Sequence, residues 1–303
     1  MKILLVVNKT LDRGGIKVFD GGYFCLYVPF LQLGHQVKFF DIADKNNNNS
    51  TFLKDVDSFK PDLIFCCLTG NQQFMPGEPD IQLFGEITRK GNIKTFNWFC
   101  DDTWRFDNFS SKVCSNFTYC STPEPIYLQK YIDIGYNNIL LGGWHSNIDM
   151  YIQSDKSTNL AFCGMLNSQR RRLQQLLEKY IPGTVFKHGI SYEDMNLLYS
   201  RSKIGLNFSI NANNGKTQMK GRMFEIPASR AVLLTEYTEG LEEFYELEKE
   251  IITFKTDKEM FEKIIYFLKN DSERVKIAEA GFNKFAKEHD SKVRLKNILS
   301  RIC

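Results

Sequence analysis

The chain has 303 residues, of which 43% are hydrophobic and 25% are charged, which excludes a disordered chain and suits one large or two medium globular domains. Its net charge of +3 is too small to indicate nucleic-acid binding by itself. The eight cysteines show neither CxxC pairs nor His partners at zinc spacing, so we expect free thiols in a reducing compartment. The apolar run in MKILLVVNKT is too short for a signal peptide or a membrane span, so it is predicted to be a strand of a cytoplasmic protein.

Short apolar runs alternate with amphipathic segments through the first half of the chain. Continuous apolar runs of this kind are typical of parallel strands that are buried on both faces. Residues 1–152 are therefore predicted to form a Rossmann-like, doubly wound α/β domain. The predicted strands cover 3–7, 37–40, 63–67, 95–99 and 117–120, and the predicted helices cover 21–33, 80–90 and 123–133.

The same alternation restarts after a polar stretch near residue 155, so residues 153–288 are predicted to form a second Rossmann-like domain. Two such domains are expected to face each other across a cleft at the carboxyl ends of their strands, where these folds bind ligands. Helices close the chain, and the last segment, 289–303, is a candidate to pack back on the first domain. The predicted strands cover 160–164, 184–189, 203–210, 232–236 and 251–254, and the predicted helices cover 168 onward, 191–200, 219–228, 257–269, 271–288 and 290–302.

One candidate motif is FCGMLNSQRR, a strand that ends at Gly164 and leads through a polar turn into a basic helix. The glycine lets a ligand approach the backbone, the helix start favours an anion, and Arg170 is suited to grip a diphosphate. The alternative is a solvated basic face of a helix.

A second candidate is the polar loop from Asn213 into the helix that carries Arg222 and Glu225. Lys216 and Arg222 suit a diphosphate, and Glu225, one turn later, suits the vicinal hydroxyls of a ribose. The alternative is an intrahelical ion pair between Arg222 and Glu225, because residues three apart share one face of a helix.

The stretch KGRMFEIPASRAVLLTEYTEGLEEFYELEKEIITF and the later AEAG resemble the spore-maturation-protein-like (CgeB-like) glycosyltransferases of the group 1 type, which have the GT-B fold. The resemblance covers about residues 160–290. It implies that Arg170 lies at the donor diphosphate and that Glu225 binds the ribose of the nucleotide. The wider retaining group carries a second Glu eight positions before this one, where this chain has Thr217, so the stereochemistry and the sugar contacts stay open.

The first half resembles the same family more loosely. NKTLDRGG, with Gly14 and Gly15, is similar to its glycine-rich cleft loop, and NWFCDDTW is similar to its Trp-Phe-x-Asp-Asp stretch. Asp101 or Asp102 is thus a candidate to accept the proton of an acceptor hydroxyl; the alternative is a helix cap or a pair with Arg105.

His188 lies at the end of the predicted strand 184–189, where the relatives place a turn that faces the donor, so it is a further cleft candidate. The Asp-Asp pair is similar to the metal-binding DxD of another glycosyltransferase fold, but that motif belongs to a different domain plan. We therefore expect no metal ion.

The function predicted from these patterns is transfer of a sugar from a UDP- or GDP-linked donor to a hydroxyl acceptor, which is a glycan, a protein or a modified nucleobase. The nucleotide sugar is a co-substrate, and no further cofactor is expected. Two alternatives stay open: a nucleotide-sugar epimerase and a non-catalytic carbohydrate-binding or assembly protein on the same fold. An NAD dehydrogenase is disfavoured, because no GxGxxG follows the first strand.

Overall fold

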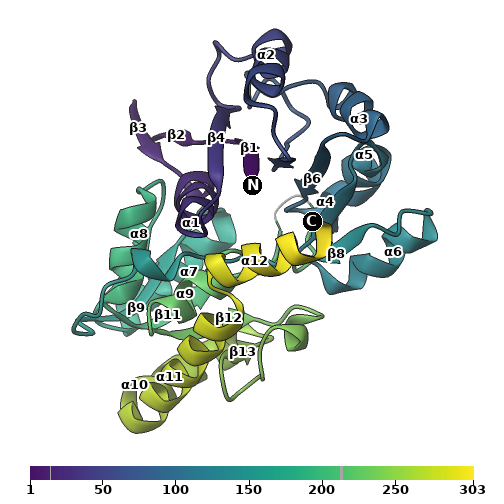
Figure 1. Ribbon diagram of the computed structural model, residues 1–303. Helices are drawn as coiled ribbons and strands as arrows, with labels where there is room; N and C mark the ends of the chain where they lie inside the picture. Colours follow the sequence, from purple (N-terminus) through teal and green to yellow (C-terminus); the bar gives the residue numbers. More distant parts are fainter. Residues whose placement is uncertain (14, 212–213) are drawn as a thin grey trace. The chain divides into compact units, whose positions relative to one another are not determined.

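The structure is a computed structural model that describes residues 1–13, 15–211 and 214–303. The chain divides into two compact units: residues 1–143 with 291–303 form unit 1, and residues 144–290 form unit 2. The sequence suggested a boundary at 152, whereas the division follows Gly143. Each unit contains its own parallel sheet, so the predicted α/β class with two doubly wound halves is confirmed (Figure 1).

The sheet of unit 1 is parallel and has the order β4–β1–β5–β6–β7–β8. Its first strand is the apolar run at the start of the chain, where Leu4 pairs with Lys38 on one side and with Ile64 on the other. The strands are β1 (Lys2–Val7), β4 (Gln36–Asp41), β5 (Leu63–Cys66), β6 (Lys94–Trp98), β7 (Tyr119–Thr122) and β8 (Ile139–Leu141); a separate antiparallel hairpin is formed by β2 (Thr10–Arg13) and β3 (Ile16–Phe19).

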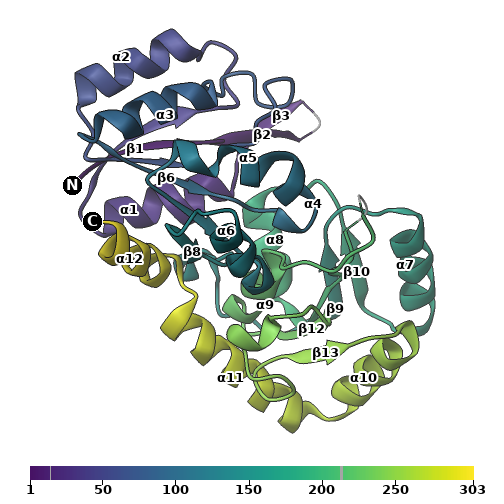
Figure 2. The same cartoon turned by 90° about the vertical axis from the view of Figure 1, so that its right-hand side faces the viewer.

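Helices cover both faces of this sheet, with α2 and α3 on one face and α1 and α12 on the other (Figure 2). Leu4 and Val6 belong to the same core cluster as Phe52 of α2 and Phe84 of α3. The helical elements are η1 (Gly22–Tyr27), α1 (Val28–Gln32), α2 (Asn49–Phe59), α3 (Ile81–Lys90), α4 (Asp102–Arg105), η2 (Phe106–Ser110), α5 (Ser111–Val113), η3 (Cys114–Asn116), η4 (Pro125–Tyr127), α6 (Leu128–Asp133) and α12 (Ser291–Ile302).

The C-terminal helix α12 is part of unit 1 although it lies at the far end of the sequence. It contacts α1 and buries Leu295 and Leu299, and the Lys94 ammonium donates to the Ile302 carbonyl at 2.7 Å. Unit 1 is therefore assembled from both ends of the chain.

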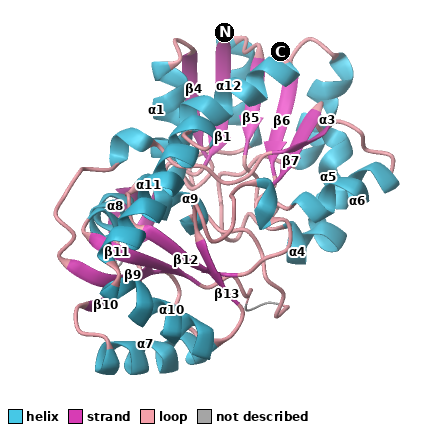
Figure 3. Cartoon of the chain, turned by 90° about the horizontal axis from the view of Figure 1, so that it is seen from below, coloured by secondary structure: helices cyan, strands magenta, loops and turns pink. Residues whose placement is uncertain are grey.

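Unit 2 has a parallel sheet in the order β10–β9–β11–β12–β13, separate from the first sheet (Figure 3). The chain forms β9, adds β10 on one side and then continues with β11 on the other, so the topology reverses between β9 and β11. The strands are β9 (Thr158–Cys163), β10 (Thr184–Lys187), β11 (Ser202–Asn207), β12 (Val232–Glu236) and β13 (Ile252–Phe254).

Helices α7 and α10 pack on one face of this second sheet, and α8 and α9 pack on the other (Figure 2). Gly205 of β11 allows the close approach of α9, because a Cβ there would lie 2.5 Å from Cγ2 of Ile226. The helical elements are η5 (Ile148–Met150), α7 (Ser168–Tyr180), α8 (Tyr192–Ser200), α9 (Arg222–Ala228), η6 (Leu241–Glu243), α10 (Asp257–Lys269) and α11 (Asp271–Glu288).

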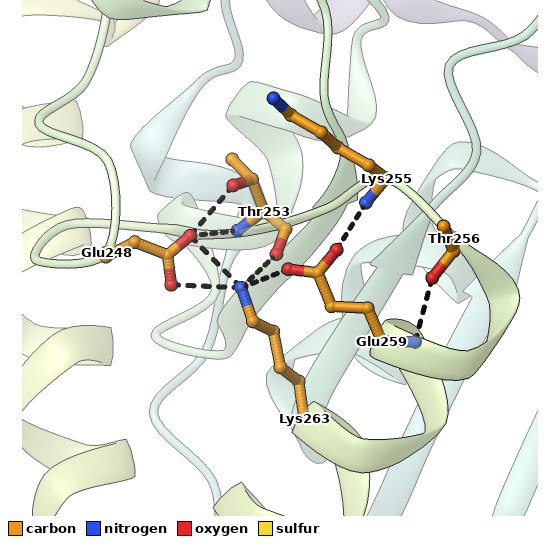
Figure 4. A network of polar contacts seen from close by, with 6 residues as sticks. All are labelled: Glu248, Thr253, Lys255, Thr256, Glu259 and Lys263. Atoms are coloured by element: carbon orange, nitrogen blue, oxygen red, sulfur yellow. Dashed lines mark hydrogen bonds and ion pairs between the residues drawn. The ribbon is translucent and has the colours of Figure 1, made fainter.

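Thr256 and Glu259 form one half of a capping box at the start of α10 (Figure 4). The Thr256 hydroxyl accepts from the Glu259 amide at 3.1 Å. The Glu259 carboxylate instead accepts from the amide of Lys255 at 2.8 Å and pairs with Lys263 at 2.9 Å, and these contacts lower its pKa. The carboxylate thus satisfies a backbone donor one residue before the cap.

In the described ranges, no helix combines the length and the apolar character that crossing a bilayer requires. The cysteines there are free thiols, and Cys66, Cys120 and Cys163 are buried in strands.

Candidate functional site

Three neighbouring strands of unit 2 end at one edge of the sheet in groups that form hydrogen bonds with polar side chains or loop amides. β9 ends at Cys163, β11 at Asn207 and β12 at Glu236. Because the strands are parallel, these ends share one edge, and the topology reverses between β9 and β11. Open α/β sheets bind ligands at this kind of position.

Arg222, the first residue of α9, joins the ends of the two strands at the reversal. Its Nε donates to Oδ1 of Asn207 at 2.9 Å, and its Nη1 donates to the carbonyl of Cys163 at 3.1 Å. The guanidinium also lies over the ring of Phe162, 5.2 Å from its centroid. A guanidinium has five N–H donors, so the contacts within the described chain leave three of them for a ligand.

Gly164 makes room for this arginine. A Cβ at that position would lie 2.8 Å from Nη1 of Arg222 and 2.9 Å from the ring of Phe162. The glycine predicted to admit a ligand therefore also admits a charged side chain from a neighbouring helix.

Arg170, on α7, reaches the same edge. Its Nη1 donates to the Met165 carbonyl at 3.0 Å, and its Nη2 donates to the Ile210 carbonyl at 3.0 Å. Burial, together with the positive charge of Arg222, lowers its pKa to about 10, while Glu236 acts in the opposite sense. Both guanidiniums are charged at neutral pH, so this edge favours an anion.

Two residues that the sequence reasoning missed hold this edge in place. Asn207 donates from Nδ2 to the Thr235 hydroxyl at 2.9 Å, while its oxygen accepts from Arg222. The Glu236 carboxylate accepts from the amides of Ser209 and Ile210 at 2.8 and 2.9 Å. Glu236 is a polar residue at the end of the predicted strand 232–236, so that signal was available in the sequence, whereas Asn207 lies inside the predicted strand 203–210.

Glu225 lies in the first turn of α9 and is half-buried. Its Oε1 folds back over the start of the helix, 3.2 Å from where a Cβ of Gly221 would lie. The Glu225 carboxylate is therefore on the same helical turn as Arg222. Two N–H groups of Arg222 point to the ends of β9 and β11.

The other predicted donor residues lie outside this cluster. Lys216 and His188 are exposed, and no contact within the described chain joins either one to Arg170 or Arg222. Thr217 is half-buried and forms a β-bridge with Ile210, whose carbonyl accepts from Arg170.

In unit 1, the two adjacent aspartates have different surroundings. Asp102 is fully buried and accepts from the Tyr131 hydroxyl at 2.9 Å. Asp101 is half-exposed just past the end of β6, and its carbonyl accepts from the amides of Trp104 and Arg105. Of the two, Asp101 is better placed to reach an acceptor.

The alternative partner for the aspartates, Arg105, has other contacts. Its guanidinium donates to the Thr69 carbonyl and lies 4.2 Å from the ring centroid of Phe109. Asp101 stands at the N-cap position of α4 but makes no side-chain capping bond.

The segment predicted as a glycine-rich loop forms the hairpin β2–β3. Gly15 is in its turn with φ of +89°, a left-handed conformation that glycine adopts without strain, and its amide donates to Oδ1 of Asp12 at 2.7 Å. Gly14 lies outside the described residues.

The chain is similar to a known protein family over part of its length and to solved structures over its whole length. Residues 165–300, a little under half of the chain, match the family described as glycosyl transferase-like. A search of proteins with curated function finds no significant match. The family match includes Arg170, Arg222 and Glu225.

Solved structures resemble the chain over its whole length. HepE from Anabaena, solved with UDP-glucose, is 11% identical with a TM-score of 0.64, and the match covers 99% of both chains. Sucrose-phosphate synthase from Thermosynechococcus elongatus is 11% identical with a TM-score of 0.67, covering 99% of this chain and 98% of that one. An α-glucosyltransferase solved with UDP and a 13-mer DNA containing an HMU base is 11% identical with a TM-score of 0.58, covering 100% and 99%.

The chain has the GT-B fold. At this sequence identity, the structural similarity establishes the fold alone. The chemistry of the protein depends on the side chains of its own chain.

The buried Asp102 predicts a specific pH dependence of stability. Burial raises its pKa above the ordinary 3.8, while hydrogen bonds from Thr122, Ser110 and Tyr131 act in the opposite sense. Between the two pKa values the native state binds more protons than the unfolded state, so this group lowers the unfolding free energy as pH rises through that window.

Asp102→Asn removes this titration and keeps an oxygen that accepts from Tyr131. We expect the difference in unfolding free energy, variant minus wild type, to increase as the pH rises from below 4. Urea denaturation at a series of pH values measures this difference. A difference that is constant with pH would show that the pKa of Asp102 is not raised.

Proposed function

We propose that the protein is a glycosyltransferase that moves a sugar from a UDP- or GDP-linked donor to a hydroxyl acceptor. The observation that carries the proposal is the pair Arg170 and Arg222 at the topological reversal of unit 2, beside Gly164. The family match over residues 165–300 supports it, because that segment supplies the helix with Arg222 and most of the arginine contacts.

In this proposal the two guanidiniums stabilise the leaving diphosphate. The bond between the anomeric carbon and the diphosphate oxygen breaks, a bond to the acceptor oxygen forms, and the acceptor hydroxyl loses its proton. Arg170 and Arg222 are held by carbonyl and amide oxygens before the ligand arrives, so little reorganisation is needed as negative charge grows. Asp101 is the candidate to accept the proton, and Glu225 is the candidate to bind the ribose.

The first test measures the affinity of the protein for the nucleotide. Arg170→Ala should weaken binding of UDP or GDP more than tenfold by calorimetry, because it removes charge-assisted hydrogen bonds. Arg171→Ala is the matched control, since Arg171 is the next residue on α7 and is exposed. Equal binding by both variants would remove Arg170 from the donor site.

An assay of donor turnover, with and without an added hydroxyl acceptor, separates the transferase from its alternatives. Release of nucleoside diphosphate that depends on an added hydroxyl acceptor supports transfer. Conversion of the donor to an epimer without acceptor would indicate an epimerase, and binding without any turnover would indicate a non-catalytic protein.

We also propose that transfer needs no metal ion, because arginine side chains supply the positive charge at the diphosphate. The rate of donor turnover should be the same in EDTA-treated and untreated protein. Loss of turnover on chelation, restored by manganese or magnesium, would contradict this.

Glu225 gives a test of ribose recognition. Glu225→Gln should lose at least tenfold in affinity for UDP or GDP, because hydrogen bonds to a charged acceptor are among the stronger ones. The wild type should discriminate against a 2′,3′-dideoxy nucleotide, and the variant should not. Glu178→Gln, an exposed Glu on α7, is the control and should behave as wild type. Equal binding of ribo- and dideoxynucleotides by the wild type would exclude the ribose contact.

A further inference from the structure

Unit 2 contains a cavity of about 200 Å³ at the edge of its sheet opposite Arg170 and Arg222. Its lining includes Lys156, which precedes β9, and Lys203, the second residue of β11. It also includes Arg230, which precedes β12. Because the three strands are parallel, their starts lie at the edge away from Cys163 and Asn207, where Arg222 binds.

Positive charge predominates in this cavity. Lys156, Lys203, Arg230 and Arg274 line it, and Glu279 is the acidic residue of the lining. Arg230 pairs with Glu279. Arg274, which is 6% exposed, pairs with Asp271 and donates to the Phe267 carbonyl at 2.9 Å.

The two lysines retain donors for a ligand. Nζ of Lys156 donates to the carbonyls of Ser200 and Ser229 at 2.9 and 2.8 Å, which uses two of its three N–H groups. In the described ranges of the chain, the half-buried ammonium of Lys203 makes neither a hydrogen bond nor a close ion pair, although its charge adds to that of Arg274 in lowering the pKa of the Asp271 carboxyl.

The charges in the cavity are not balanced. Burial, together with the positive charges of Arg230 and Arg274, lowers the pKa of Lys156 to about 8, and Glu279 only partly opposes them. An anion in the cavity would relieve this repulsion.

Arg230 has an unusual backbone conformation for its residue type. Its φ of +56° lies in the left-handed region, which glycine adopts without strain and arginine rarely does. Arg230 directly follows the last residues of α9, and its amide donates to the Pro227 carbonyl at 3.0 Å, so the left-handed conformation ends the helix and directs the chain into β12.

We propose that this cavity binds a small molecule that carries a phosphate group, at a site separate from the proposed donor site. Lys203 and the third N–H of Lys156 donate to the phosphate oxygens, and the guanidinium of Arg230 adds charge. Ile152 and Val275, which line the cavity and are 55% and 53% exposed, contact the carbon atoms of the ligand. Since a water molecule occupies about 30 Å³ in the liquid, the cavity has room for more than a bare anion.

The test is calorimetric titration of the full chain with phenyl phosphate, inorganic phosphate and benzoate at constant ionic strength. We expect phenyl phosphate to bind more tightly than either of the others, because it alone combines the phosphate with an apolar body. Lys203→Gln should weaken it about tenfold, and Glu279→Gln should tighten it, because that variant removes the opposing charge. Circular dichroism of both variants should match that of the wild type.

Two controls locate the site. Lys276→Gln makes the same charge change on α11 outside the cavity lining and should leave the affinity unchanged. Arg170→Ala should retain binding of phenyl phosphate, because Arg170 lies at the other edge of the sheet. Absence of binding to the wild type, equal affinity in folded Lys203→Gln, or loss of binding in Arg170→Ala would each overturn the proposal.

Discussion

The organisation of unit 2 depends on one guanidinium. Arg222 connects the carbonyl that ends β9 to the amide that ends β11, and it thereby fixes the start of α9 against the sheet. Because of this contact, position 164 can hold only a residue as small as glycine. Glu225 lies on the same helical turn as Arg222. Since leaving buried donors unsatisfied costs free energy, the arrangement is held in place whether or not a ligand is bound.

The chemical type of their hydrogen-bond acceptors decides whether Arg170 and Arg222 can still attract an anionic ligand. Arg170 and Arg222 are held by neutral carbonyl and amide oxygens, so their positions are fixed while their charge is not cancelled. A carboxylate partner would fix an arginine equally well and remove much of its attraction for a ligand. The nearby carboxylate, Glu236, accepts instead from two backbone amides of the following loop.

The sequence predicted the order of the elements well, since strong apolar periodicity sets them locally; β12, α10 and α11 have the predicted bounds. It did not predict the hairpin after β1, whose polar residues read as a loop, or the contacts of Asn207, which depend on which strands become neighbours. Asp101 and Asp102 look equivalent in sequence. They differ in the structure, where the second is buried and accepts from Tyr131, 29 positions later in the chain.

The return of α12 to unit 1 has a consequence for how the chain is made. Unit 2 is continuous, so all of its strands and helices have been synthesised by Asp290. Unit 1 still lacks the helix that contacts α1 until residues 291–303 have left the ribosome. Because domains generally fold as units during synthesis, unit 2 can complete its packing before unit 1 does.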